Sequence, residues 1–171
     1  MHRFFHFALL IGGMLALTGC AGYRLGPTNG ETAGAHSVQI NPFVNRTLEP
    51  RLSDYLISSL RKNLQQDGTY RLNTHDEGDI LLSGVITSYN RSELSFQPND
   101  IITVQDYEIR MTAQVIARER STGKIIFDRP VTGRTTLRAG NDLTSAERQA
   151  IPLMTDDLAK KATALLADGT W

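Results

Sequence analysis

The thiol of Cys20 is the most reactive nucleophile in this 171-residue sequence, which contains a single cysteine. A lone cysteine has no partner for a disulfide within its own chain. A catalytic thiol would need a histidine held close to it by the fold. Two of the four histidines, His2 and His6, lie in the segment before Cys20, and nothing in the sequence places another beside it. Covalent modification of the sulfur is the chemistry that remains.

The residues before Cys20 have the pattern of an export signal. Residues 4–17 are almost wholly apolar and follow a short start that carries Arg3. About 14 residues span roughly 21 Å as a helix, whereas a bilayer core of about 30 Å needs about 20 residues. The length therefore fits a cleaved signal better than a permanent membrane span.

Residues 17–20 (LTGC) resemble the bacterial lipobox, in which a small residue precedes a cysteine that receives a diacylglycerol. The resemblance implies that residues 1–19 are removed as a signal peptide and that Cys20 carries lipid. Ala21 in the next position is similar to lipoproteins sent to the outer membrane. Two or more acyl chains give stable anchoring. The alternative is an ordinary secretory signal followed by a chance cysteine.

The chain after Cys20 divides into a tether and one domain. Residues 20–35 are rich in glycine, threonine and other turn-forming residues, which is typical of a linker leading off the membrane. Residues 36–171 are long enough for a single domain. The formal net charge of the whole chain is zero, so no strong field favours nucleic acid as a partner.

Alternation and helical periodicity predict the order strand, helix, three or four strands, helix. Strands are expected at residues 36–43, 69–72, 80–89, 102–120 and 124–138. Pro42 should end the pairing of the first strand, and residues 90–101 should form a long connection. The strand at 102–120 is clearest, because six apolar residues alternate with six polar ones: Tyr107, Ile109, Met111, Ala113, Val115 and Ala117 share one face.

Two amphipathic helices should cover that apolar face. The first has Thr47 as a candidate cap, Pro50 in its first turn, a stripe of leucines and a stop at Gly68. The second begins at a capping box formed by Thr144 and Glu147. Its expected apolar stripe is Ala146, Ala150, Leu153, Leu158, Ala162 and Leu165. The predicted fold is α+β, an antiparallel or mixed sheet of four to five strands with two helices on one face.

The sequence shows no catalytic or metal-binding signature. The two remaining histidines, His36 and His75, have no spacing that suggests a metal site, and no phosphate loop or nucleophile elbow occurs. The carboxylate pairs Asp106/Glu108 and Asp156/Asp157 fit solvated charges on amphipathic elements. The chain is therefore predicted not to be an enzyme and to need no cofactor beyond the lipid on Cys20.

Four arginines occupy the polar side of the last two predicted strands. Arg110 and Arg118 alternate with the apolar residues of one strand, and Arg134 and Arg138 with those of the next. A hairpin would bring these rows together, and planar guanidinium groups suit phosphate. Arg110, Arg134 and Arg138 are the candidate ligands of a phosphorylated lipid. The alternative is ordinary charge that keeps a sheet face soluble.

The chain resembles the lipopolysaccharide-assembly lipoprotein family, LptE. The resemblance rests on residues 20–25 (CAGYRL), 38–43 (VQINPF) with Asn45, 49–52 (EPRL) and 78–84 (GDILLSG) with Tyr89. The strand with Tyr107, the turn at 122–124 and the terminal helix complete it.

This resemblance implies a sheet covered by two helices and a partner, the outer-membrane β-barrel LptD, inside which the lipoprotein sits as a plug. It also implies a role in inserting lipopolysaccharide into the outer leaflet, with some members contacting that lipid through basic residues. The choice of Arg110, Arg134 and Arg138 as lipid contacts rests on strand alternation alone. A rival interpretation is an outer-membrane-anchored periplasmic protein that activates a cell-wall synthase.

Overall fold

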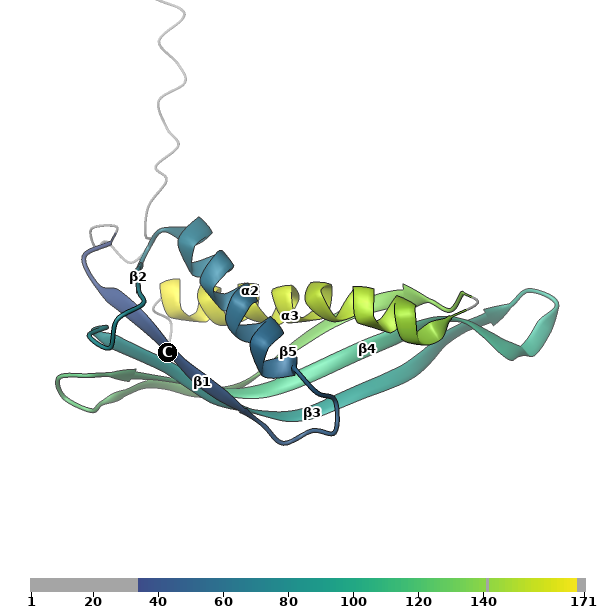
Figure 1. Cartoon of the computed structure of the whole chain (residues 1–171), viewed down its shortest axis with the longest axis horizontal. Helices are drawn as coiled ribbons and strands as arrows, with labels where there is room; N and C mark the ends of the chain where they lie inside the picture. Colours follow the sequence, from purple (N-terminus) through teal and green to yellow (C-terminus); the bar gives the residue numbers. More distant parts are fainter. Residues whose placement is uncertain (1–33, 141, 169–171) are drawn as a thin grey trace, which may run out of the picture.

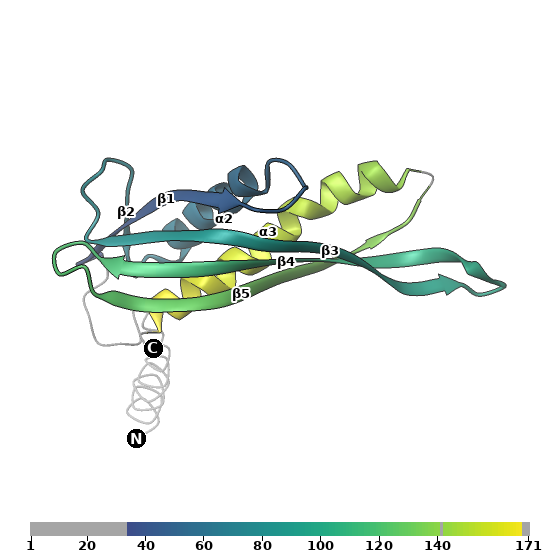
Figure 2. The ribbon, with the colours of Figure 1, turned by 90° about the horizontal axis from the view of Figure 1, so that it is seen from below.

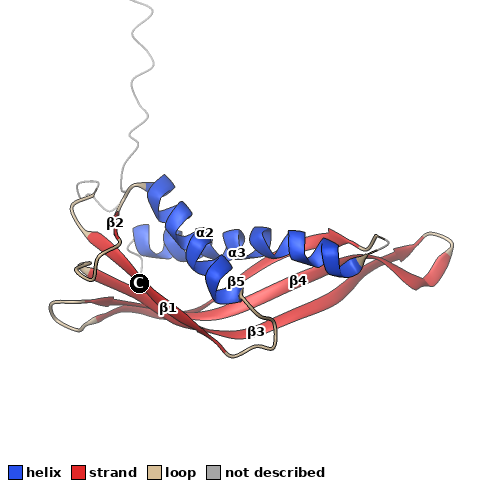
Figure 3. Ribbon diagram, viewed as in Figure 1, coloured by secondary structure: helices blue, strands red, loops and turns tan. Residues whose placement is uncertain are grey.

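Five strands form one mixed sheet, and two helices lie together on one of its faces (Figures 1 and 3). The computed structural model describes residues 34–140 and 142–168. The elements are β1 (Ser37–Asn45), α2 (Leu52–Asp67), β2 (Arg71–Asn73), β3 (Ile80–Gln97), β4 (Asp100–Glu119), β5 (Ile125–Arg138) and α3 (Leu143–Ala167). Their order confirms the predicted α+β class.

The sheet has the strand order β2-β1-β3-β4-β5. The strand β1 runs parallel to both of its neighbours, β2 and β3, whereas β3, β4 and β5 form an antiparallel meander. The α2 connection between β1 and β2 is needed because parallel neighbours cannot be joined by a tight hairpin.

The predicted alternation of apolar and polar residues along β4 is confirmed, and its apolar side forms part of the core. Ile109, Met111, Ala113, Val115 and Ala117 are fully buried under the helices, while Arg110 and Arg118 on the other side are exposed. A strand with one face covered and one face open produces this period of two.

The helix α2 ends as predicted and begins later than predicted. Gly68 adopts a left-handed φ of 74°, and its N–H donates to the Leu64 carbonyl at 3.2 Å. The start is different, because Arg51 precedes the helix with a φ of 63° and no side chain caps it. Thr47 bonds instead to Asn45, at 2.8 Å between hydroxyl and amide oxygen, which stabilises the loop before the helix. Pro50 lies before the first turn.

The helix α3 differs from prediction at its start and along its stripe. Asp142 is the cap, accepting from the Ser145 N–H at 3.2 Å, so Thr144 and Glu147 do not form a capping box. Leu153 is 62% exposed and lies outside the core. The helix continues through Pro152. Ala150, Leu158 and Ala162 of the predicted stripe are buried, and Ala146 and Leu165 pack at the margin of the core. The buried stripe also contains residues that were not predicted: Ile151, Met154, Ala159 and Leu166.

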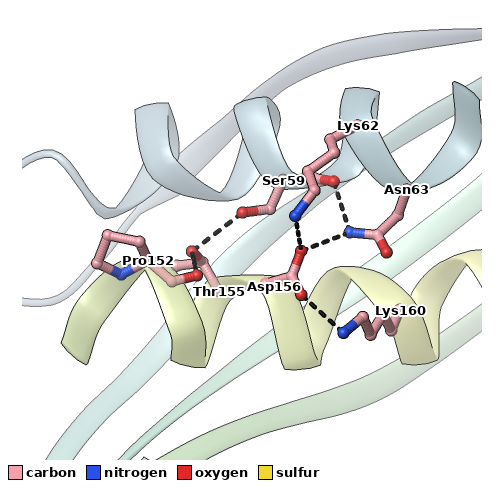
Figure 4. Close-up of polar contacts among 7 residues, drawn as sticks. All are labelled: Ser59, Lys62, Asn63, Pro152, Thr155, Asp156 and Lys160. Carbon is pink, nitrogen blue, oxygen red and sulfur yellow. Dashed lines mark hydrogen bonds and ion pairs between the residues drawn. The ribbon is translucent and has the colours of Figure 1, made fainter. Parts of the chain in front are cut away.

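A row of polar contacts joins the two helices (Figure 4). The Ser59 and Thr155 hydroxyls lie 3.2 Å apart. Asp156 accepts from Asn63 at 3.0 Å and from Lys62 at 3.3 Å, and it also pairs with Lys160 at 2.9 Å. These bonds hold the pKa of Asp156 below its usual value. Asp156 therefore contributes to the contact between the two helices, and Asp157 accepts from the Arg134 N–H of β5 at 2.9 Å.

The hairpin of β3 and β4 projects past the N-terminal end of α3 (Figures 1 and 2). Residues 90–101 do not form the long connection that was expected, because β3 extends to Gln97 and β4 begins at Asp100. Both faces of this projection are largely exposed, so its residues carry no apolar alternation that would mark a strand. Pro42 also fails to end its strand, since pairing with β3 resumes at Phe43 after an irregularity.

Candidate functional site on the polar face of the sheet

The sheet face opposite the helices is uncovered in the structure (Figure 2). It presents the even-numbered residues of β4 and β5, because successive side chains of a strand point to opposite faces. Arg110, Arg134 and Arg138 are all exposed there, as predicted. The sequence-based face assignment of the three candidate arginines is thus confirmed, and their role as lipid ligands stays a prediction.

Arg110 and Arg134 lie directly opposite each other on neighbouring strands. The N–H of Arg134 donates to Asp157 of α3 at 2.9 Å, so it points away from β4. The two arginines therefore form a non-hydrogen-bonded pair, the kind in which opposed Cα atoms approach to about 4.5 Å. Like charges directly opposite each other are unfavourable. A bound anion would relieve that repulsion.

Carboxylates lie between the arginines on the same face. Arg110 pairs with Glu108 at 2.5 Å, and Arg138 pairs with Asp106 at 3.1 Å. The guanidinium-bearing side chains are 50% and 72% exposed, whereas those of Glu108 and Asp106 are 14% and 30% exposed. The positive groups therefore form the outermost layer. Among the described residues, Arg134 alone of the three has no ion pair with a carboxylate on this face.

Hydrogen bonds tie Asp106 into the hairpin of β3 and β4. The Ser95 hydroxyl donates to Asp106 at 2.6 Å, and the Arg138 guanidinium donates at 3.1 Å. These two bonds hold the pKa of Asp106 below its usual value. Asp106 is thus a fixed acceptor that orients the Arg138 side chain. This contact depends on the register of β4 and β5, which cannot be predicted from the sequence.

Arg118 does not join the other arginines. It lies eight residues along β4 from Arg110, opposite Ile125, and donates to the Gly123 carbonyl at 2.8 Å. The lipidation candidate Cys20 and most of the tether lie outside the described residues. In the described ranges no group of histidine, cysteine or carboxylate side chains could hold a metal ion.

A second polar cluster lies on the helix side of the sheet and was missed by sequence reasoning. Glu147 of α3 accepts from the Tyr89 hydroxyl and from Arg91, the latter at 2.6 Å. The Arg91 guanidinium also lies 5.5 Å from the centre of the Tyr107 ring. Burial and the bond to Glu147 raise the pKa of Tyr89. The sequence pattern around Glu147 predicts a capping box and gives no sign of this contact with β3.

Solved structures with the same fold include several bacterial proteins. A hypothetical protein from Chlamydia trachomatis aligns with a TM-score of 0.56 at 12% identity, covering 77% of this chain and 95% of that one. A minor lipoprotein from Acinetobacter baumannii aligns with a TM-score of 0.53 at 17% identity, covering 77% and 92%. These likenesses establish the fold. No curated protein is similar to this chain in sequence.

The family model described as LptE, lipopolysaccharide-assembly, matches residues 35–164. The match spans every described strand and all but the end of α3. In the part of the chain that is described, no helix has both the length and the apolar character to cross a membrane. The chain belongs to the LptE lipopolysaccharide-assembly family.

Proposed function

We propose that this protein is the outer-membrane lipoprotein subunit of a lipopolysaccharide transport machinery, which plugs and stabilises an LptD-type β-barrel and assists lipopolysaccharide insertion into the outer leaflet. The family match over residues 35–164 carries the proposal. The uncovered polar face supports it, because the lumen of a membrane barrel is itself polar. The role is non-enzymatic, and lipid on Cys20 would hold the domain at the membrane.

Isolation of the full-length chain from outer membranes should bring a large β-barrel protein with it. The experiment uses residues 1–171 with a tag after Trp171, expressed in the native host and extracted in mild detergent. The expected partner is a barrel protein that changes its mobility on gels when heated. Recovery of an inner-membrane cell-wall synthase in place of a barrel would favour the rival function, and recovery of neither would contradict both.

The three arginines are proposed to contact phosphates of lipopolysaccharide. Guanidinium groups bind phosphate through paired, charge-assisted hydrogen bonds, each contributing about 1.5–3 kcal/mol when well formed and less when exposed. The opposed pair Arg110 and Arg134 supplies two such groups at one place, and Arg138 lies further along β5.

Changing Arg110, Arg134 and Arg138 together to glutamate should weaken lipopolysaccharide binding at least tenfold at low salt. Added salt should partly reproduce the loss in the unchanged protein. Arg118→Glu is the matched control, because Arg118 lies on the same face of β4 and bonds to its own turn. A glutamine triple variant checks that new repulsion near Glu108 is not the cause. Unchanged binding by folded triple variants would contradict the lipid-contact role of the arginines. It would not affect the proposal that the protein plugs a barrel.

A further inference from the structure

Side chains of α3 cover the outer edge of β5. Lys161 of α3 donates to the Thr132 carbonyl at 2.9 Å, and Asp157 accepts from the Arg134 N–H at 2.9 Å. The two helix side chains are also paired with each other at 2.7 Å. Pro130, two residues before, has no N–H to offer. Proteins close the edges of sheets in such ways to prevent unwanted strand pairing.

The corresponding edge of β3 is open over six residues. Pairing of β3 with β1 ends at Ile86, opposite Asn45, and the Arg46 N–H then donates to the Ile86 carbonyl at 3.0 Å. From Ser88 to Glu93 the only described strand beside β3 is β4. Irregularities in the pairing bound this stretch on both sides. Six residues is close to the usual length of a strand.

The register identifies which backbone groups face outward. Because the Arg134 N–H points away from β4, the odd-numbered residues of β4 bond toward β5 and the even-numbered ones toward β3. The partners of Tyr89, Arg91 and Glu93 on β4 are odd-numbered. The N–H and C=O groups of these three residues therefore face the open edge.

Of the two charged side chains in this stretch, Arg91 is held toward α3 and Glu93 is exposed. Charged side chains on edge strands normally discourage pairing. Here Glu147 binds both Arg91 and the Tyr89 hydroxyl and draws them toward α3. A groove of about 420 Å³ runs beside the strand, between residues 46–49 and 87–90. The backbone groups at this edge of β3 are thus accessible to a partner, whereas those at the outer edge of β5 are not.

Exposed apolar side chains flank the open stretch at both ends. Leu48 beside the groove is fully exposed, and Leu94 and Phe96 beyond Glu93 are 51% and 44% exposed. Ile102 on the facing strand of the hairpin is 85% exposed. These groups offer apolar contacts at both ends to a segment that pairs along the free strand edge.

We propose that the edge of β3 from Ser88 to Glu93 binds an extended segment of the barrel partner as an added β-strand. This inference rests on the proposed function. Main-chain hydrogen bonds would supply affinity, and the flanking apolar groups would select a segment with apolar side chains near its two ends. A closed barrel has no free strand edge of its own. The segment would therefore come from a loop, a terminus or a neighbouring domain of the partner.

Proline at position 93 should break this contact without breaking the hairpin. The Glu93 N–H faces the open edge, so Glu93→Pro removes a donor to the partner and none to β4, much as Pro130 does in β5. Glu93→Ala is the matched control, because it loses the same side chain and keeps the N–H. We expect the Pro variant to recover at least tenfold less barrel partner than the Ala variant from detergent-extracted outer membranes. Equal recovery by the two folded variants would overturn the proposal.

Hydrogen exchange of the unchanged full-length protein provides a second test that needs no variant. Amides in the peptide covering residues 88–97 should exchange at least tenfold more slowly in the isolated barrel complex than in the lipoprotein alone. A complex that forms without this protection overturns the strand contact and leaves the proposed function standing. Failure to isolate any complex overturns the proposed function itself. Protection in the lipoprotein alone, with dimer formation, would assign the edge to a second copy and also overturn the proposal.

Discussion

The Met111→Asp variant should be largely unfolded at pH 7 and 25 °C. Met111 is fully buried beneath the helices, and the residues opposite it on β3 and β5 are Tyr89 and Gly133. Neither neighbour offers a positive charge. A carboxylate at this position would be buried without a partner.

The expected loss is comparable to the whole stability of an ordinary domain. Removing the methionine side chain forfeits about 1.5–3 kcal/mol of apolar burial. An unpaired buried charge costs several kcal/mol more, even after the structure relaxes. A single domain is stable by only about 5–15 kcal/mol. The folded fraction without denaturant, together with the urea midpoint where one exists, measures the loss in a chain beginning at residue 21.

Two controls separate the buried charge from other effects. Thr112→Asp places the same carboxylate one residue away on the uncovered face, where we expect a loss of about 1 kcal/mol or less. Met111→Leu keeps the apolar volume and should cost less than about 1.5 kcal/mol. Equal midpoints for Met111→Asp and Thr112→Asp would show that the face assignment of β4 is wrong.

The penalty should also depend on pH in a definite direction. Burial raises the pKa of an aspartate in the folded state above its unfolded value of about 3.9. The folded state of the variant then binds its proton more tightly than the unfolded state does. The deficit relative to the unchanged protein should therefore shrink as pH falls from 7 toward about 4.

All five strands were predicted where they have a buried face, but the projecting part of the β3–β4 hairpin, which has none, was missed. In β4 the helices cover one side, so selection for burial leaves a period of two that can be read without a structure. The projecting part of the hairpin has two exposed sides, so residues such as Ser92 and Ser95 carry no such signal. The start of α2 was also misplaced, because Arg51 in a left-handed conformation has no sequence signature.

The candidate site was predictable only to the level of a face. Alternation alone placed Arg110, Arg134 and Arg138 on the polar side of the sheet. Their register was unknown, so neither the opposition of Arg110 and Arg134 nor the pairing of Arg138 with Asp106 could be foreseen. The open edge of β3 was hidden for a similar reason, since it depends on where the pairing with β1 stops.

Replacing Cys20 by serine should abolish lipid attachment completely. The hydroxyl of serine is a far weaker nucleophile than the thiolate of cysteine. Without the attached lipid, a lipoprotein peptidase has no substrate, so the precursor should keep residues 1–19. Labelled fatty acid should appear in the unchanged protein and be absent from the variant, and intact mass should show the uncleaved signal.

The Ala21→Asp variant is the matched control for this experiment. It changes the residue next to Cys20 and leaves the sulfur in place, so it should still be lipidated and cleaved. Because acidic residues at this position resemble those of lipoproteins kept at the inner membrane, its location should change while its lipid remains. Each buried CH₂ contributes about 0.8 kcal/mol to anchoring, so two or more acyl chains give stable membrane attachment. Normal acylation of Cys20→Ser would contradict the anchor, and with it the placement of residues 35–164 at the outer membrane.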